Sequence, residues 1–249
     1  MSILLSNDDG ITSDGLAALQ EALAPVDEIW IVAPDRDQSA VSHSLTLYRP
    51  LRIEPAGLRA FAVDGTPTDC INLAINGILT QRPRLVISGI NRGANLGDDV
   101  TYSGTVSAAM EATLLGVPAI AVSLAGRERF DFATAAAFTR ELAETVLRDQ
   151  LPADTLLNVN VPDLPPEQIK GFALTRQGKR RYGDAIVEKV DPRGKKYYWI
   201  GGSEVGFVDA EGTDFSAIEQ GLISVTPLHL DLTNYASLKR LQGLTVRWP

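Results

Sequence analysis

The sequence predicts an α/β fold in which helices cover both faces of an open, mainly parallel, Rossmann-like sheet, with an antiparallel hairpin extension at the C-terminal end. Three observations support this fold. The first 35 residues form a strand–helix–strand unit, residues 85–87 and 119–122 are apolar throughout, and strand and helix patterns alternate as far as Val161. Continuously apolar strands are typical of parallel sheets that helices bury on both faces.

The first elements follow from local patterns. Residues 3–5 are apolar and are followed by Ser6-Asn7-Asp8-Asp9-Gly10, which predicts a buried strand that ends in a loop. Ser13 is suited to cap a helix that reaches about Leu23, because its hydroxyl can accept from an early helical N–H. Residues 28–33 predict a second strand, stopped by Pro34. A helix between two strands implies parallel pairing with a right-handed crossover.

The later elements continue this alternation and then change character. We expect helices over residues 69–79, 104–115 and 131–147, and strands over residues 84–88, 119–123 and 156–161. Beyond the prolines of residues 161–166, antiparallel strands are expected over residues 172–175, 185–190 and 197–201. The chain is expected to end with a helix over residues 213–220, a strand over residues 222–226 and a helix over residues 233–241.

Composition excludes several classes of protein. The 249 residues include 31 acidic and 23 basic side chains, a net charge of -8. A protein that binds duplex nucleic acid is not expected, because phosphate contacts need clustered Lys and Arg. No run reaches the roughly 18 apolar residues that span a bilayer, and the N-terminus lacks the basic region of a signal peptide. We therefore expect a cytoplasmic protein with no membrane partner. Cys70 is the only cysteine, so the chain cannot form an internal disulfide.

Charge is distributed unevenly along the chain. Residues 1–169 hold 11 basic and 22 acidic side chains, whereas residues 170–249 hold 12 basic and 9 acidic ones. The basic run over residues 176–199 also contains Tyr182, Tyr197, Tyr198 and Trp199. Such a segment could stack against nucleotide bases. A solvated hairpin that contacts another subunit is the favoured alternative, and a hairpin that lies over an active site is a third.

Polar loops follow three of the predicted strands, at the edge where open α/β sheets bind ligands. Asp8 and Asp9 follow the first strand, Ser39 lies after the second, and Asn91 follows the strand of residues 84–88. Two adjacent carboxylates repel each other, and a divalent cation relieves the repulsion. Ligands that are all oxygen favour Mg²⁺ or Mn²⁺. A simple turn that leads into a helix is the alternative explanation of Asp-Asp-Gly.

A second polar cluster precedes the helix of residues 104–115. Ser103, Gly104 and Thr105 could hold a phosphate, because the first N–H groups of a helix have no helical acceptor and attract anions. Asn95 could add its amide. An ordinary Ser/Thr cap explains the same spacing equally well.

Other phosphate-binding motifs are absent or weak. A phosphatase with a carboxylate nucleophile needs Asp at the position of Asn7, and an amide cannot form an acyl-phosphate. There is no Gly-Lys-Ser/Thr, and Gly89, Gly93 and Gly97 miss the dinucleotide-binding spacing. We interpret the remaining polar candidates as structural or surface residues: His43, Cys70, Asp98, Asp99 and His229.

Together these motifs resemble the SurE family, the survival-protein nucleotidases. The matching segments run through nearly the whole chain in family order: residues 3–10, 32–36, 44–47, 65–70, 88–99, 102–106, 225–228 and 231–233. The resemblance implies a metal-dependent 5′-nucleotidase, a phosphatase that hydrolyses nucleoside 5′-monophosphates and, in some members, 3′-monophosphates and short polyphosphate. It places metal ligands at Asp8, Asp9, Ser39 and Asn91. It places phosphate contacts at Asn95, Ser103, Gly104 and Thr105.

The resemblance also implies one Mg²⁺ or Mn²⁺ per subunit, and homodimers or homotetramers that exchange their C-terminal segments. We accordingly expect residues 1–166 to form the catalytic core and residues 167–249 to form the hairpin, a final core strand and an oligomerisation tail. Asp8 is the expected catalytic carboxylate that orients or deprotonates water, with Asp9 mainly a ligand. The alternative function is a non-catalytic nucleotide-binding regulatory module, which would not need the paired carboxylates.

Overall fold

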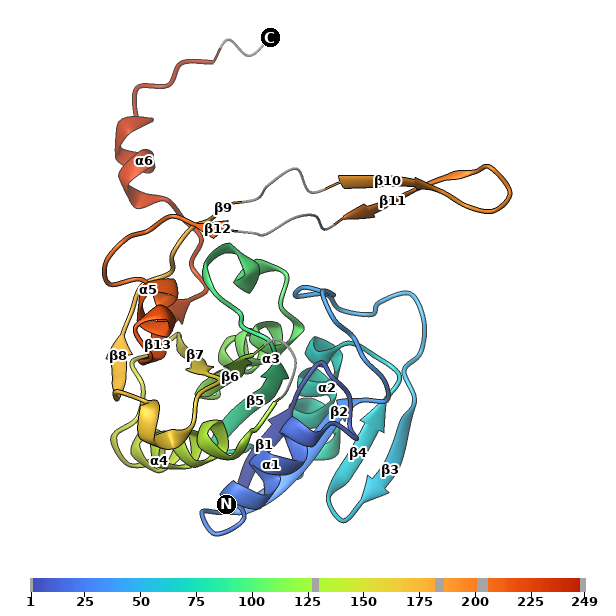
Figure 1. The fold of residues 1–249 in the computed structure, drawn as a ribbon. Coiled ribbons are helices and arrows are strands. Elements are labelled where there is room, and N and C mark those ends of the chain that lie inside the picture. Colours follow the sequence, from blue (N-terminus) through green and yellow to red (C-terminus); the bar gives the residue numbers. More distant parts are fainter. Residues whose placement is uncertain (1, 127–129, 182–185, 201–205, 247–249) are drawn as a thin grey trace.

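A nine-stranded, mostly parallel sheet forms the centre of the computed structural model, which describes residues 2–126, 130–181, 186–200 and 206–246 (Figure 1). Its strands are β1 (Ser2–Ser6), β2 (Glu28–Pro34), β3 (Ile53–Gly57), β4 (Ala60–Val63), β5 (Leu85–Arg92), β6 (Ala119–Ala125), β7 (Thr155–Pro162), β8 (Phe172–Leu174) and β13 (Ile223–His229). Their order across the sheet is β3-β4-β2-β1-β5-β6-β7-β13-β8. The pairs β3–β4 and β7–β13 are antiparallel, and the other neighbouring pairs are parallel.

Helices cover both faces of this sheet, which confirms the predicted fold class (Figure 1). Strand β1 shows why, because Ile3 and Leu5 belong to one apolar core and Leu4 belongs to the other. The helices α1 (Asp14–Leu23) and α4 (Ala133–Asp149) contribute to the first core. The helices α2 (Pro67–Leu73) and α3 (Gly104–Leu114) contribute to the second. Within the described ranges, no helix is long and apolar enough to cross a membrane.

Helix and strand ends refine the sequence-based expectations. The Ser13 hydroxyl accepts from the Leu16 N–H at 3.4 Å, which confirms the predicted cap of α1. Helix α2 starts two residues earlier than expected, and a π-helical turn, Ala74–Ile78, replaces its second half. Strand β5 does not end at residue 88 but continues to Arg92 through an irregular pairing with β6. Asn91 therefore lies in a strand rather than in a loop.

The C-terminal part departs from one expectation. Strands β10 (Ile186–Val190) and β11 (Lys196–Ile200) form the predicted antiparallel hairpin; residues 185 and 201 of the prediction lie outside the described residues. Strand β8, in contrast, is not part of an antiparallel set but pairs in parallel with β13 at the edge of the main sheet. The prediction was wrong because a local pattern shows that a segment is a strand but does not show its partner.

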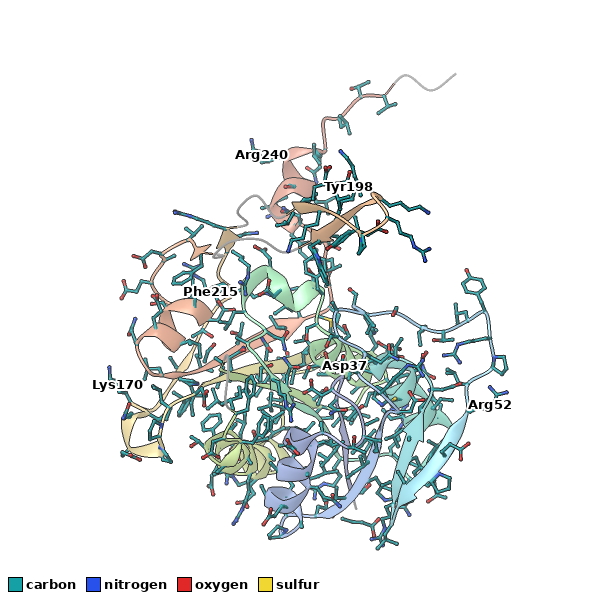
Figure 2. The ribbon with its side chains drawn as sticks, turned by 45° about the vertical axis from the view of Figure 1, so that its right-hand side comes forward. Asp37, Arg52, Lys170, Tyr198, Phe215 and Arg240 are labelled. Carbon is teal, nitrogen blue, oxygen red and sulfur yellow. The ribbon has the colours of Figure 1, made fainter. Side chains whose placement is uncertain are left out.

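The hairpin and the last helix extend away from the sheet. The short strands β9 (Arg180–Arg181) and β12 (Gly206–Phe207) pair with each other where the hairpin leaves the body. Tyr198 on the hairpin and Arg240 on α6 (Tyr235–Arg240) both stand clear of the sheet (Figures 1 and 2). Helix α5 (Asp214–Glu219) instead packs beside β13 and β7 of the main sheet (Figure 1). The division at residue 166 remains a prediction.

Candidate active site

The loops after β1, β2 and β5 meet at the carboxyl edge of the sheet. Strand β1 pairs in parallel with both β2 and β5, so all three strands end on the same side. The Gln38 N–H donates to the Asp8 carbonyl at 2.8 Å, and the Arg92 N–H donates to Oδ2 of Asp9 at 3.3 Å. The loop after β2 and the last residue of β5 are thus both bonded to the Asp8-Asp9 pair. The convergence expected from the sequence is present.

Asp8 is buried against the first turn of α3. Its side-chain Oδ1 accepts a hydrogen bond from the Thr105 hydroxyl. A Cβ at Gly104 would lie only 2.8 Å from the Cβ of Asp8, so glycine permits this approach. Burial raises the pKa of Asp8 to about 6, and the charge of Asp9 adds to the effect, while the bond from Thr105 opposes it. A cation beside this carboxylate would relieve the cost of its burial.

Asp9 and the Ser39 loop add further oxygen atoms. Burial raises the pKa of the half-buried Asp9, and the charge of Asp37 contributes, while Arg92 opposes the shift. Oδ1 of Asp37 accepts from the Ser39 hydroxyl at 2.6 Å and from the Ser39 N–H at 2.7 Å. Asp37 was not among the predicted site residues, although an Asp two residues before a Ser is a recognisable turn signal. Figure 2 shows it among the loops at the sheet edge.

Asn91 reaches the same edge from β5. Its amide nitrogen donates to the Gly93 carbonyl at 2.8 Å, which leaves the amide oxygen as the atom that a hard cation would bind. In the part of the chain that the structure describes, no group of three or more His, Cys, Asp or Glu side chains could hold a metal. The predicted set holds only two such side chains, Asp8 and Asp9, beside a hydroxyl and an amide oxygen, and it remains a prediction. Such an all-oxygen set suits Mg²⁺ or Mn²⁺.

The Ser/Thr-rich start of α3 has two interpretations, an ordinary helix cap and a phosphate-binding turn. The Ser103 hydroxyl accepts from the Val106 N–H at 3.1 Å and so caps the helix. The Thr105 hydroxyl is bonded to Asp8. The N–H groups of Gly104 and Thr105 lie in the first turn, where the helix supplies no acceptor. An anion at this position could therefore be held by these backbone N–H groups and by the Ser103 hydroxyl, whose proton the cap does not use, whereas the Thr105 proton is bonded to Asp8.

Asn95 belongs to a buried amide cluster. Its side-chain nitrogen donates to the Ser123 hydroxyl at 2.8 Å, and its backbone N–H donates to Oδ1 of Asn160 at 2.8 Å. The side chains of Asn158 and Asn160 donate to the Asn95 carbonyl at 2.9 and 3.0 Å. These bonds fix the chain between β5 and α3. A phosphate contact by Asn95 remains a prediction.

A network that sequence reasoning missed ties the Ser39 loop to two helices. Glu111 of α3 is buried, and its oxygens pair with Nε2 of His43 at 2.9 Å and accept from Nδ2 of Asn72 at 2.8 Å. Burial acts to raise the pKa of Glu111, but the bonds from His43 and Asn72 outweigh it and leave the pKa below its ordinary value. His43 and Glu111 lie 68 positions apart, so no local pattern could have revealed the pair.

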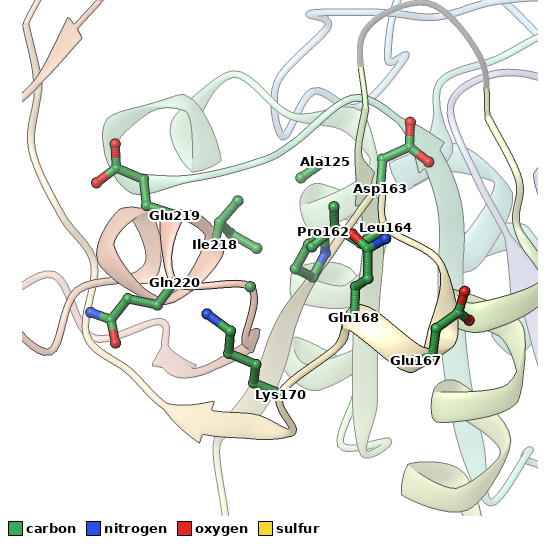
Figure 3. Close-up of a pocket in the computed structure, with 11 residues that line it drawn as sticks. Ala125, Pro162, Asp163, Leu164, Glu167, Gln168, Lys170, Ile218, Glu219 and Gln220 are labelled. Carbon is green, nitrogen blue, oxygen red and sulfur yellow. The ribbon is translucent and has the colours of Figure 1, made fainter.

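An open cleft of about 600 Å³ lies beyond the ends of β6 and β7, beside α5 (Figure 3). Its lining includes Pro162, Asp163, Lys170, Ile218 and Gln220, and none of the predicted metal or phosphate residues. The buried Asp8 and the half-buried Asp9, both with raised pKa values, lie instead beside the N-terminal turn of α3. We therefore assign the candidate site to the ends of β1 and β5.

Comparison with known proteins identifies the family of the chain. Residues 3–184 match the family described as "Survival protein SurE". A protein of Geobacter sulfurreducens named 5′-nucleotidase SurE is 61% identical over 244 residues, which cover 98% of this chain and 93% of that protein. A protein of Geotalea uraniireducens with the same name is 59% identical, with 100% and 99% coverage. The crystal structure of a SurE protein from Aquifex aeolicus superposes with a TM-score of 0.88 at 49% identity and covers 97% of this chain and 98% of that one. The chain belongs to the SurE family.

Proposed function

We propose that the protein is a metal-dependent 5′-nucleotidase that hydrolyses nucleoside 5′-monophosphates to nucleoside and phosphate. The observation that carries this proposal is the approach of the buried Asp8 carboxylate to the first turn of α3, beside Asp9. A cation held at the carboxylates and an anion held by helical N–H groups would be neighbours there. Close relatives that this chain matches over nearly their whole length carry the name 5′-nucleotidase SurE, which supports the same activity.

One ion per subunit, Mg²⁺ or Mn²⁺, would be held by Asp8, Asp9, Ser39 and Asn91. The chemistry that a bound ion supplies is neutralisation of phosphate charge and a more acidic water. The donor set supports this choice, because all four groups can offer oxygen. Asp9 acts mainly as a ligand in this proposal.

Side-chain and backbone groups of the chain itself would take separate roles in the hydrolysis of the phosphate ester. Asp8 orients or deprotonates the attacking water, whose oxygen forms a bond to phosphorus as the bond from phosphorus to the nucleoside oxygen breaks; the nucleoside oxygen leaves as a hydroxyl and takes up the proton that the water gives up. The bond from Thr105 holds the Asp8 carboxylate in one orientation. The N–H groups of Gly104 and Thr105 donate to the phosphate oxygens, where negative charge concentrates. Asn95 and Ser103, which both precede this turn, would add side-chain contacts to the phosphate, and their bonds to Asn160 and to the Val106 N–H fix the backbone before it.

We also propose a wider range of substrates and an assembly of several subunits. Nucleoside 3′-monophosphates and short polyphosphate would use the same phosphate contacts. Homodimers or homotetramers that exchange C-terminal segments would cover the apolar side chains of the tail, since Leu232 is 94% exposed and Leu238 and Leu241 are 56% exposed. We place the enzyme in the cytoplasm, without a duplex nucleic-acid or membrane partner.

The decisive assay is phosphate release from AMP, with and without EDTA. We expect Mn²⁺- or Mg²⁺-dependent release that EDTA abolishes. A panel of 5′- and 3′-monophosphates and polyphosphate then defines the substrate. The second candidate, a non-catalytic nucleotide-binding module, would be favoured by metal-independent AMP binding without any phosphate release.

A further inference from the structure

The segment that leads into α3 is held by a buried carboxylate from the C-terminal part of the chain. A short 3₁₀ helix, Gly97–Thr101, connects the Asn95 cluster to Ser103. Asp214, at the start of α5, is completely buried. Its Oδ2 accepts from the Gly97 N–H at 2.7 Å, and its Oδ1 accepts from the Gly178 N–H at 2.8 Å. One carboxylate thus joins the beginning of the 3₁₀ helix to the base of the hairpin.

The contact leaves no space at Gly97. This residue has a φ of +53°, and a Cβ there would lie 2.7 Å from the Phe215 ring and 2.9 Å from the Gly178 carbonyl oxygen. The Gln177 side-chain nitrogen also donates to the Gly97 carbonyl at 3.1 Å. Both backbone groups of Gly97 are therefore bonded to residues more than 70 positions away. Figure 2 shows Phe215 on the side of the molecule where α5 lies.

An ion pair secures the next part of the same 3₁₀ helix. Arg180 pairs with Asp99, and the two side chains are only 22% and 25% exposed. The guanidinium also lies 5.6 Å from the centre of the Phe215 ring, a cation–π distance. The adjacent pair of Lys179 and Asp98 is different, because the Lys179 side chain is 75% exposed. Exposed pairs of this kind contribute little to structure.

The far end of the 3₁₀ helix touches the loop that carries Ser39. The Ser42 hydroxyl donates to the Thr101 carbonyl at 2.6 Å, and the Ser42 N–H donates to the Tyr102 carbonyl at 3.1 Å. Ser103 follows at once as the cap of α3. The residues that precede the helical N–H groups are thus fixed from two sides, by the C-terminal part and by the Ser39 loop.

We propose that Asp214 and Arg180 are positioning residues that set the first turn of α3 for phosphate binding. Neither side chain touches the substrate in this account, which rests on the proposed function of that turn. Preorganised N–H donors bind an anion without a cost of reorganisation, so loosening the preceding segment weakens phosphate binding. Neither side chain is bonded to a proposed metal ligand, so we expect a smaller effect on the affinity for the ion than on phosphate binding.

The test compares Arg180→Gln and Asp214→Asn with Lys179→Gln in the full-length enzyme. Lys179→Gln is the matched control, because it removes one charge from the neighbouring exposed pair. We expect both positioning variants to raise KM for AMP and Ki for inorganic phosphate about tenfold, the effect of losing one charge-assisted hydrogen bond. The midpoint for Mn²⁺ activation should shift less, and most of kcat should stay unchanged. The control should remain close to the wild type in every value.

Wild-type KM and Ki in a folded Arg180→Gln enzyme would overturn the proposal, whether or not Asp214→Asn folds. An equal loss of Mn²⁺ affinity would also contradict it, because the effect would then be a general loss of structure. Failure of the proposed function has a different signature, since the wild type itself would release no phosphate from AMP. Direct calorimetry with inorganic phosphate then decides: weaker binding by Arg180→Gln than by the wild type supports the positioning role, whereas equal binding by both proteins, or no binding by the wild type, refutes it.

Discussion

Thr105 donates a hydrogen bond to Oδ1 of Asp8, although the two residues are 97 positions apart in the sequence. The bond joins the loop after β1 to the first turn of α3, and Gly104 allows the contact by lacking a side chain. A carboxylate and a helix N-terminus are thereby brought to one point at the edge of the sheet. This relationship connects the proposed metal site with the proposed phosphate site.

Removing the Thr105 hydroxyl should impair catalysis. In Thr105→Val the Asp8 carboxylate loses the bond that fixes its orientation, and we expect kcat for AMP to fall about tenfold or more. The matched control is Thr113→Val on the same helix, because the Thr113 hydroxyl bonds only its own helix, at the Ala109 carbonyl. Steady-state kinetics at saturating Mn²⁺ make the comparison. Equal kcat values in the two variants would show that the bond to Asp8 has no catalytic role.

The buried Asp8 should make the metal-free protein less stable at neutral pH. Its pKa of about 6 in the folded protein exceeds its ordinary value of 3.8, so the folded state binds the proton more tightly. Stability from this group is therefore full below pH 4 and is lost as the pH rises through about 6, by up to about 3 kcal/mol. Asp8→Asn removes this dependence.

Thermal unfolding in EDTA at pH 5 and pH 7.5 measures the effect. The difference in Tm between Asp8→Asn and the wild type should grow in favour of the variant as the pH rises. Mn²⁺ at pH 7.5 should raise the Tm of the wild type more than that of the variant, which keeps three of the four proposed ligands. A difference in Tm that is the same at both pH values would contradict the buried charge.

Several of these features could be predicted from the sequence, because they depend on neighbouring residues. Apolar runs such as residues 85–87 predict buried strands, and Ser13 predicts its helix start. Asp8 and Asp9 stand at a strand end, where parallel topology alone places them at the binding edge.

Other features depend on pairings that no local pattern contains. The bond from Gly97 to Asp214 spans 117 positions, and Asp98 and Asp99 looked like ordinary loop charges before their partners at residues 179 and 180 were known. Strands β3 and β4 were missed, because β3 is exposed along its whole length and lacks an apolar alternation. The parallel pairing of β8 with β13 likewise results from tertiary packing.

The tight fit at Gly97 predicts an unusually costly substitution. Gly97→Ala should lose about 1 kcal/mol for its positive φ and about 1–3 kcal/mol more, because the new Cβ meets the Phe215 ring and a backbone carbonyl. Gly116→Ala is the control, since its φ is +74° and the nearest atom to a Cβ is 3.6 Å away. Urea denaturation gives both free energies of unfolding. Equal losses in the two variants would mean that the segment around Gly97 adjusts freely.

The most direct test of the account is phosphate release from AMP by Asp8→Asn at saturating Mn²⁺. Asn has nearly the same shape as Asp and can still accept the bond from Thr105, so the variant should fold. The account predicts a fall in turnover of roughly 10³-fold or more, because the group that orients or deprotonates water is lost. Phosphate release close to the wild-type rate would contradict the assignment of Asp8 as the catalytic carboxylate.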